Sequence, residues 1–300
     1  MRINFQSLLL LASFASSAAG CNGDARLCGR KYSNVTQIGA HNSAFVGELP
    51  TQNQGLQVEG QLDMGIRFLQ AQTHNLFDLG ELFMCHTSCF LLNTGPLVRY
   101  LERINTWMVA HPNEVVTLLL TNPDKVDVST FGKAMVDSGL SKLAYTPSKK
   151  LALNEWPTLQ EMINSKKRLV MFLDYHADTA KVPYILDEFA YCFETPFSQT
   201  DPNFAQCSVD RPPNASSAGR FSIINHVLDI AISKDVLIPD ILAAEKTNSV
   251  ASIMAQVGLC QKAHGTTPNF ILLDYAERVV FFKAYVSTTT STFLVSFGYH

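Results

Sequence analysis

Two histidines end short apolar runs in the first third of the chain. His41 follows the run at residues 35–40, and His86 follows the run at residues 81–85. A histidine side chain exchanges a proton near neutral pH, because its unperturbed pKa is about 6.5. Two histidines that are brought together by the ends of two strands could act as general base and general acid across one substrate.

The elements that must position these histidines alternate along the chain. We expect strands at residues 35–40, 65–73, 81–85, 115–121, 168–174, 221–226 and 270–274, and helices after Gly95-Pro96 and near residues 131–137 and 159–165. Near-continuous apolar strands separated by helices favour a parallel sheet. We therefore predict an α/β fold with a closed (β/α)8 TIM-type barrel. An open doubly wound sheet is the alternative, although no Gly-x-Gly-x-x-Gly follows the first strand.

The N-terminus has the composition of a secretory signal. Arg2 precedes an apolar stretch at residues 8–15, and small residues follow at 16–20. We expect residues 1–20 to be a signal peptide, residues 21–300 to form a single domain, and the mature protein to be secreted. No other apolar run reaches the ~18 residues of a transmembrane span, so no transmembrane anchor is expected.

Other features of the sequence agree with secretion. In an oxidising compartment most of the seven cysteines should pair, and the spacing favours three disulfides. The expected pairs are Cys21–Cys28, Cys85–Cys89 and Cys207–Cys260. Cys192 is left in an apolar run, where we expect a buried thiol. Two Asn-x-Ser/Thr sequons predict glycosylation at Asn34 and Asn214.

The charge of the chain argues against one class of binding partner. The formal net charge is -3 and no basic stretch could follow a nucleic-acid backbone, so we expect no nucleic-acid partner. We expect a monomer.

The residues around the two histidines resemble a known family. The segments at residues 39–43 (Gly-Ala-His-Asn-Ser), 61–68 (Gln-Leu-Asp-Met-Gly-Ile-Arg-Phe) and 85–86 (Cys-His) are similar to the catalytic X region of phosphatidylinositol-specific phospholipases C. Residues 68–74, 85–89, 113–121 and 225–229 extend the resemblance to secreted fungal phospholipase-C-like phosphodiesterases. This second likeness covers nearly the whole mature chain and implies a distorted TIM barrel.

The resemblance implies roles for three residues. His41 would be the base on a substrate hydroxyl that attacks the phosphodiester, and His86 would be the acid that protonates the leaving oxygen. Asp274 resembles the late carboxylate that orients the first histidine. Such a carboxylate fixes the tautomer of the ring and raises its basicity. At the strand ends we further expect five substrate-binding residues: Asn42, Gln70, Gln72, Asp174 and Asn225.

The sequence departs from the family where phosphate charge is stabilised. Phosphoryl transfer needs positive charge beside the phosphate oxygens. Bacterial members place an Arg two residues after an Asp on the second strand, and calcium-dependent members place carboxylates there, whereas this chain has Gln70 and Gln72. Strand alternation puts Arg67 on the opposite face. Asn42 matches a calcium ligand of the calcium-dependent members, but its carboxylate co-ligands are not evident, so no cofactor is assigned and calcium stays open.

Three functions fit these observations. The first is a phosphodiesterase that acts on a phosphoinositide, a glycophospholipid or a soluble head-group diester, with a membrane lipid head group as one form of the substrate. The second is a catalytically altered barrel that serves as a secreted binding module. The third is a metallohydrolase whose ligands would be His41, His74, His86 and Asp174.

Overall fold

The computed structural model describes residues 20–76, 80–234, 236–278, 285–288 and 291–294. Apart from Gly20, the expected signal peptide lies outside these residues. Within them, no helix combines the length and the apolar character needed to cross a bilayer.

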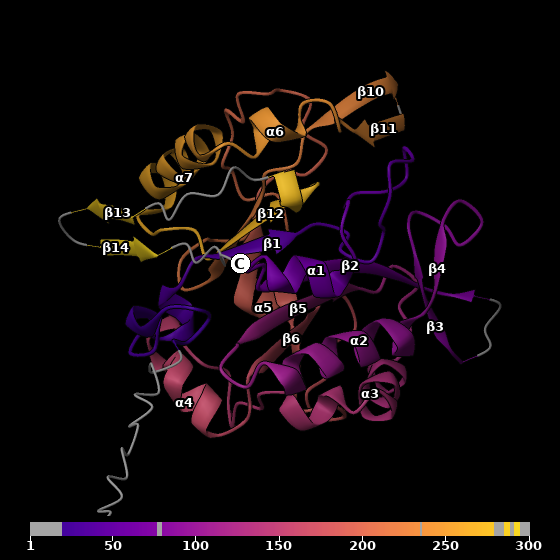
Figure 1. Ribbon diagram of the computed structural model, residues 1–300, viewed down its shortest axis with the longest axis vertical. Coiled ribbons are helices and arrows are strands. Elements are labelled where there is room, and N and C mark those ends of the chain that lie inside the picture. The colour runs from indigo at the N-terminus through magenta and orange to yellow at the C-terminus, as the bar shows by residue number, and fades with distance from the viewer. Residues whose placement is uncertain (1–19, 77–79, 235, 279–284, 289–290, 295–300) are drawn as a thin grey trace, which may run out of the picture.

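Eight parallel strands form a curled sheet that follows the order of the chain (Figure 1). They are β1 (Gln37–Ala40), β2 (Phe68–Asn75), β5 (Val116–Thr121), β6 (Leu169–Leu173), β7 (Ile185–Asp187), β8 (Cys192–Glu194), β9 (Phe221–Asn225) and β12 (Phe270–Leu273). The first strand pairs with the last, β1 with β12. In the described part of the chain no ladder joins β7 to β8, which are linked by the single turn of α5 (Glu188–Tyr191). The expected distorted TIM-type barrel is confirmed.

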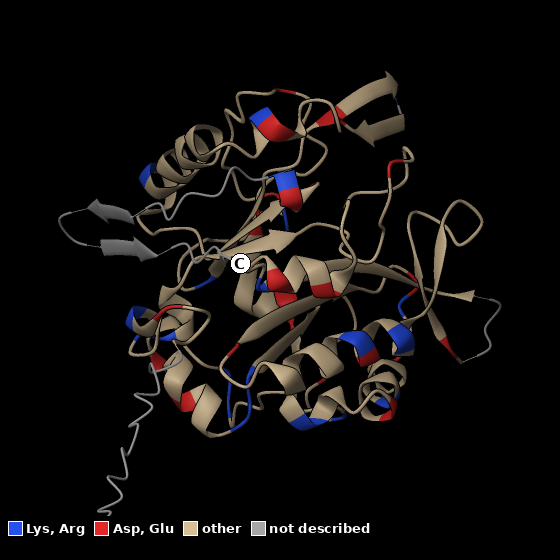
Figure 2. Ribbon diagram, viewed as in Figure 1, with Lys and Arg blue, Asp and Glu red and all other residues tan. Residues whose placement is uncertain are grey.

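Helices and smaller sheets surround this barrel. The other α-helices are α1 (Val58–Asp63), α2 (Leu97–Ala110), α3 (Val128–Asp137), α4 (Leu159–Asn164), α6 (Ala244–Thr247) and α7 (Val250–His264). Short 3-10 helices lie at Ala25–Leu27, Tyr32–Asn34, Leu140–Leu143, Leu153–Glu155 and Ala276–Arg278. The antiparallel strands are β3 (Leu82–Cys85) and β4 (Asn93–Pro96), which extend β2, and the hairpins β10 (Asp229–Ser233) with β11 (Val236–Pro239) and β13 (Tyr285–Thr288) with β14 (Ser291–Leu294). Positive and negative side chains are interspersed over the outer helices (Figure 2).

Alternation along the strands separates the barrel interior from its outer face. Phe68, Phe172 and Phe270 are buried in one inner cluster that the N-terminal segment closes with Tyr32. The intervening residues, such as Leu69 on β2, pack outward against helices that include α2. Because side chains alternate with a period of two, the inner positions continue to the carboxyl ends of the strands. There the inner side chains are Gln70, Asp174, Asn225 and Asp274.

Gly39 lies in the barrel wall just before His41, where close packing requires a small residue. A Cβ atom at this position would lie 2.7 Å from Cδ1 of Phe68 and 2.9 Å from Cδ2 of Leu272. Both of these side chains are fully buried. The glycine therefore lets the aromatic layer fill the barrel directly beneath the strand end that carries His41.

Three disulfides fasten loops to this framework. They join Cys21 to Cys28, Cys85 to Cys89 and Cys207 to Cys260, which are the pairs expected from the sequence. Cys192 is a free and buried thiol. Asn34 and Asn214 are both exposed, so the expected glycosylation stays a prediction with accessible acceptors.

We expect Gly39→Ala to lower the free energy of unfolding by about 1–3 kcal/mol, because the added methyl group overpacks a filled interior. Thermal and urea denaturation measure the change. Gly258→Ala is the matched control. Nothing lies within 4 Å of its Cβ position in α7, so alanine should raise stability by about 0.5–1 kcal/mol. A loss of stability of equal size in both variants would contradict the packing argument.

Candidate active site

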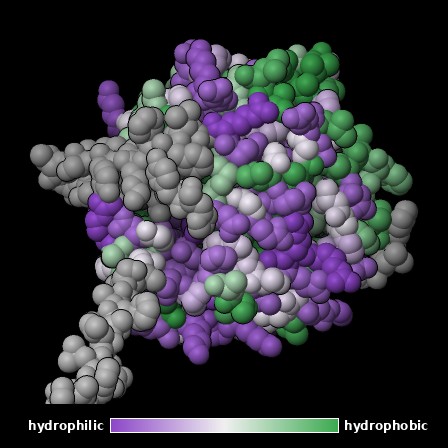
Figure 3. Space-filling view, in the orientation of Figure 1, coloured by the Kyte–Doolittle hydropathy of each residue, from purple (hydrophilic) through white to green (hydrophobic). Residues whose placement is uncertain are grey.

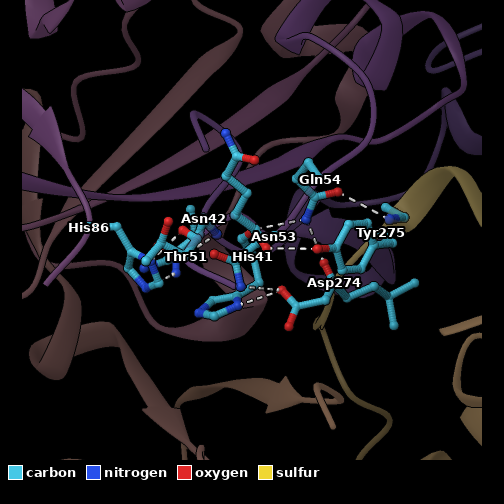
Figure 4. A network of polar contacts seen from close by, with 12 residues as sticks. His41, Asn42, Thr51, Asn53, Gln54, His86, Asp274 and Tyr275 are labelled. Carbon is cyan, nitrogen blue, oxygen red and sulfur yellow. Dashed lines mark hydrogen bonds and ion pairs between the residues drawn. The ribbon is translucent and has the colours of Figure 1, made fainter. Parts of the chain in front are cut away.

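His41 and Asp274 come together because adjacent strands end beside each other. β1 and β12 pair in parallel with Ala40 opposite Leu273, so the next residue of each strand lies at the same level. His41 Nδ1 is 2.8 Å from Asp274 Oδ1. The two side chains face each other in Figure 4. Asn53 Nδ2 donates a second hydrogen bond, of 2.9 Å, to the same carboxylate oxygen. The carboxylate is thereby fixed, and His41 Nδ1–H is directed toward it.

His86 reaches the same place by a different route. β3 folds back along β2 and delivers His86 at its end. His86 Nδ1 lies 2.7 Å from the carbonyl oxygen of Thr51, which can only accept, so this nitrogen carries a proton. His86 Nε2 lies 3.2 Å from Asn42 Nδ2, and the ring stacks on Phe45. The Nε2 atom of a neutral His86 is therefore an acceptor in this arrangement.

Asn42 connects the two histidines. It directly follows His41, its side chain contacts His86, and its backbone N–H donates to Gln70 Oε1 at 2.8 Å. Its φ of 49° lies in the left-handed region, which asparagine adopts more readily than most residues. The sharp turn after β1 thus aims the main chain of residue 42 at β2 and its side chain at His86.

The surroundings shift the pKa values of the two histidines in opposite directions. Burial by itself lowers the pKa of His41. The charge of Asp274 and its hydrogen bond, together with smaller effects of the charges of Asp229 and Glu194, outweigh burial and raise that pKa. Burial lowers the pKa of His86, and the bond to the Thr51 carbonyl offsets this only in part. The charge of His41 lowers the pKa of His86 further. In the free site the proton is held more firmly by His41 than by His86.

The two glutamines on β2 hold the loops that carry the histidines. Gln70 Oε1 accepts from the backbone of Asn42, and Gln72 Oε1 accepts from the backbone N–H of Thr87 at 3.1 Å. Their acceptor oxygens are thereby committed to the main chain. Neither residue supplies the positive charge that phosphoryl transfer needs.

Asp174 lies at the end of β6 and is hydrogen-bonded to the main chain just after β5 and β6. Its Oδ1 accepts from the backbone N–H groups of Asn122 and Tyr175, both at 2.7 Å. Burial raises the pKa of Asp174 to about 6, against the lowering effect of these two bonds. The structure therefore brings Asp174 to the inner side of the barrel, but its hydrogen bonds are to Asn122 and Tyr175 and not to the histidines.

A charged pair at the end of β8 was not found from the sequence. Glu194 accepts from Asn225 Nδ2 at 2.9 Å and forms an ion pair with Arg211. The fully buried Glu188 has a pKa raised by burial and by the charge of Glu194. Glu194 ends an apolar run as His41 does, so the expectation of functional residues at strand ends could have identified it. Arg211 follows no strand, and the sequence carries no signal for it.

Arg67 takes no part in the site. Its guanidinium pairs with Glu114 Oε2 at 2.7 Å, at the amino-terminal side of β5, and also donates to the carbonyl oxygen of Leu62. This agrees with the opposite strand face that alternation predicts.

The expected metal ligands do not converge. His74 pairs with Asp124 at 3.1 Å, and within the residues that the structure describes no group of three His, Cys, Asp or Glu side chains could hold a metal ion. Calcium takes six to eight oxygen ligands. Around Asn42 the nearby acceptor of Gln70 is already bonded to the main chain. This donor set does not fit calcium, and we derive no step through it.

The structure is a parallel TIM-type barrel that carries His41, Asp274 and His86 at the carboxyl ends of its strands. The family model described as PI-PLC X 1 matches residues 27–287. The chain therefore belongs to the PI-PLC X domain family. It is 47% identical over 277 residues to a PI-PLC X domain-containing protein 1 of Arthroderma benhamiae, covering 89% of this chain and 90% of that protein. A second protein of that fungus, described as an uncharacterized secreted protein, is 45% identical over 267 residues, and the match covers 85% of this chain and 60% of the relative.

Solved structures support the fold. A mutant of the phosphatidylinositol-specific phospholipase C from Staphylococcus aureus has a TM-score of 0.57 at 16% identity, covering 83% of this chain and 89% of that one. The phosphatidylinositol-specific phospholipase C from Listeria monocytogenes has a TM-score of 0.55 at 14% identity, with 84% and 92% covered. At such low identity the likeness concerns the barrel alone.

We expect Asp274→Asn to lower the pKa of His41, because the variant removes the charge that raises this pKa most. Titration of the histidine ring C–H resonances by NMR measures this without any substrate. The control is Asp124→Asn, which removes the carboxylate beside the distant His74 and should leave the His41 titration unchanged. An unaltered His41 pKa in Asp274→Asn would show that the carboxylate does not control this proton.

Proposed function

We propose that this protein is a secreted phosphodiesterase in which His41 is the general base and His86 the general acid. One observation carries the proposal: the hydrogen-bonded pair of His41 and Asp274 lies beside His86, with Asn42 between the two histidines. An oriented base and a second proton carrier on one rim are what in-line displacement at phosphorus requires. Membership of the PI-PLC X family supports the same chemistry.

The proposed reaction moves one proton at each histidine. His41 Nε2 takes the proton of a hydroxyl group on the substrate, whose oxygen forms a bond to phosphorus. The bond from phosphorus to the leaving oxygen breaks, and His86 Nε2 gives that oxygen a proton. A cyclic phosphodiester results, and water can open it with the two roles reversed.

Asn42 can follow the protonation state of His86. With a neutral His86 its Nδ2 donates to Nε2, and its Oδ1 is buried without a partner in the described structure. A rotation of the amide by half a turn would present Oδ1 to a protonated Nε2. The negative charge of a bound phosphodiester favours that protonated form. Substrate binding thus favours the protonated form of His86, which the free site disfavours.

Arg211 and Glu194 are candidates for contact with the head group. The guanidinium is partly buried, its Nε has no partner in the described structure, and its carbon centre lies 4.5 Å above the ring of Phe197. The charge of Arg211 also acts on Asp174. We infer that this pair, with Asn225, binds hydroxyl groups or phosphate oxygens across the barrel from the histidines.

Secretion belongs to the same proposal. The expected signal peptide, the three disulfides and a relative described as secreted all support an extracellular protein. The substrate would be a phosphoinositide, a glycophospholipid or a soluble head-group diester.

A binding module without turnover is the second candidate function. The observation that favours it is the neutral pair Gln70 and Gln72, whose acceptor oxygens bind the main chain at positions where bacterial members carry an Asp and an Arg. Such a module would bind phosphodiesters without converting them.

We expect His41→Ala and His86→Ala each to lower kcat at least about 10²-fold, because each removes one proton carrier. The measurement is turnover of phosphatidylinositol, an inositol phosphodiester and a glycerophosphodiester, each with calcium and with a chelator. His74→Ala is the control, since this residue lies with Asp124 outside the site. Calcium-independent turnover that both alanine variants lose supports the proposal. Activity that survives in both variants refutes it, and native protein that binds but never turns over points to the module.

Arg211→Lys keeps a positive charge but loses the planar fork of the guanidinium. We expect kcat/KM to fall about tenfold, because the variant loses one charge-assisted hydrogen bond to the substrate, worth about 1.5–3 kcal/mol. The thermal unfolding midpoint should change little. Arg99→Lys, on the exposed surface of α2, should leave kcat/KM unchanged. An Arg211→Lys enzyme with native kinetics would remove this residue from the substrate site.

A further inference from the structure

The two histidines of the site are supported by very different elements. His41 follows β1, which pairs on both sides with strands of the barrel. His86 follows β3, which leaves the barrel and pairs only with the outer end of β2 and with β4 (Figure 1). The ladder between β3 and β4 is irregular, because its register shifts between Phe83 and Cys85. The sheet alone therefore fixes His86 less firmly than His41.

The loop between β3 and β4, residues 86–92, is not held by burial of its apolar side chains. Phe90 is 87% exposed and Leu91 is 62% exposed. Figure 3 shows hydrophobic surface at the right-hand edge of the molecule, where Figure 1 places this loop. Apolar side chains that stay in contact with water contribute little to stability. The turn that carries His86 must therefore be held by other bonds.

The backbone is strained directly after His86. Thr87 has a φ of 61°, in the left-handed region, where a β-branched residue is an outlier. The N–H of Ser88 donates to the carbonyl oxygen of His86 at 2.6 Å, which closes a tight turn around Thr87. Asn42, in the equivalent place after His41, is left-handed too, but asparagine adopts this region readily. A threonine keeps such a conformation only where its surroundings impose it.

The disulfide between Cys85 and Cys89 spans this turn. It joins the residue before His86 to a residue just beyond Thr87, over a sequence separation of 4. Cys85 is fully buried, whereas Cys89 lies in the partly exposed loop. The bridge thus ties the strained segment to a point that is fixed in the interior.

The short span of this disulfide indicates a local role. A disulfide stabilises a protein mainly by restricting the unfolded chain, and this effect grows with the length of the closed loop. The sequence separation is 4 here, against 7 for Cys21–Cys28 and 53 for Cys207–Cys260. Of these three disulfides, Cys85–Cys89 should contribute least to global stability. Its effect is concentrated on the segment that it encloses, which contains His86.

The hydrogen bonds of His86 depend on the path of this turn. The N–H of Thr87 donates to Gln72 Oε1, and the N–H of His86 donates to the carbonyl oxygen of Leu92 at 3.1 Å. On the ring itself, Nδ1 donates to the carbonyl oxygen of Thr51. If Thr87 relaxed to an ordinary backbone conformation, its N–H group would turn away from Gln72 and the ring would move with the main chain.

We propose that the Cys85–Cys89 disulfide is a positioning group for His86, because it imposes the left-handed conformation on Thr87. Without the bridge the turn relaxes, and the imidazole loses its place between Thr51 and Asn42. This inference rests on the proposed function for the role of His86 as the acid. Its geometric part, that the bridge sets the position of the ring, is tested without substrate.

The test opens the bridge in the variant Cys85→Ala/Cys89→Ala and follows the ring C–H resonances of His86 by NMR titration. Burial lowers the pKa of this ring in the native protein, and the charged groups that act on it are His41 and Asp274. We expect the His86 pKa to rise in the opened variant toward the ordinary value of about 6.5, because a displaced ring is more exposed to water. Circular dichroism and thermal unfolding verify that the variant is folded.

Turnover gives a second measurement. On any diester of the panel above that the native protein converts, kcat of the opened variant should fall at least about tenfold with little change in KM, because a small displacement of a catalytic group slows the reaction. The matched control is Cys21→Ala/Cys28→Ala, which removes the other short disulfide, in the N-terminal segment. It should leave both kcat and the His86 titration unchanged.

A rescue experiment separates backbone strain from loss of the threonine side chain. Thr87→Gly, added to the opened variant, should bring the His86 titration back toward the native one, because glycine adopts a φ of 61° without steric cost. Thr87→Ala in the same background should not. Alanine also removes the hydroxyl group, but it keeps the restriction on φ.

Three results would overturn the positioning role. They are a native His86 titration in the opened variant, a rescue by alanine as complete as that by glycine, and an opened variant that does not fold, which would give the bridge a global role. Native protein that converts no diester would instead count against the proposed function. The titrations would still decide the role of the bridge, so the two failures are distinguishable.

Discussion

The candidate site depends on one constraint, the pairing of the first barrel strand with the last. His41 and Asp274 are 233 residues apart in the chain and meet only because β1 and β12 lie in parallel register. Gln54 reinforces that junction, since its Nε2 donates both to the carbonyl of His41 and to the carbonyl of Leu273. A chain in which β12 had not docked would possess both histidines, but the first would lack its carboxylate. The pairing of β1 with β12 and the formation of the His41–Asp274 contact are thus one structural event.

Uncharged amides, and not ion pairs, hold the groups around that junction. Asn53 fixes the carboxylate, Gln70 fixes the turn after His41, and Gln72 fixes the turn after His86. Directional hydrogen bonds of this kind set positions without adding a net charge to the site. Asp274 therefore remains the dominant electrostatic influence on His41. An arginine in place of either glutamine would lower the pKa of a nearby histidine, so the same substitution that loses a phosphate partner also protects the proton affinity of the pair.

Much of this arrangement could be predicted because the longer strands have clear apolar patterns in the sequence. Continuous apolar runs that end in polar residues indicated seven strands, and reading each run to its end placed the histidines and Asp274 at one rim. β7 and β8 have only three residues each, too few for a periodic signal, so neither was predicted as a strand. Glu194 follows an apolar run, but without a predicted strand it was not recognised as a strand end. α7 buries one stripe at Ile253, Gln256, Val257 and Cys260, but this stripe contains a glutamine and the apolar Leu259 lies outside it, so the apolar pattern did not predict the helix. The sequence correctly placed Gln70 and Gln72 at the end of their strand, but it did not indicate their hydrogen-bond partners. These partners are backbone groups of the loops after β1 and β3, and the paths of loops cannot be read from the sequence.

The opposite shifts of the two histidines connect binding to chemistry. The proposed reaction needs a neutral His41 and a protonated His86, whereas the free site favours the proton on His41. A phosphodiester anion placed between them raises the pKa of both rings. The increase matters most for His86, whose hydrogen-bond partners among the described residues are a carbonyl and an amide. The hydroxyl that approaches His41 Nε2 must find that nitrogen free. The productive proton distribution is therefore a property of the complex. Because Gln70 and Gln72, the side chains nearest to the histidine turns, carry no charge, His86 depends on the substrate anion to become protonated.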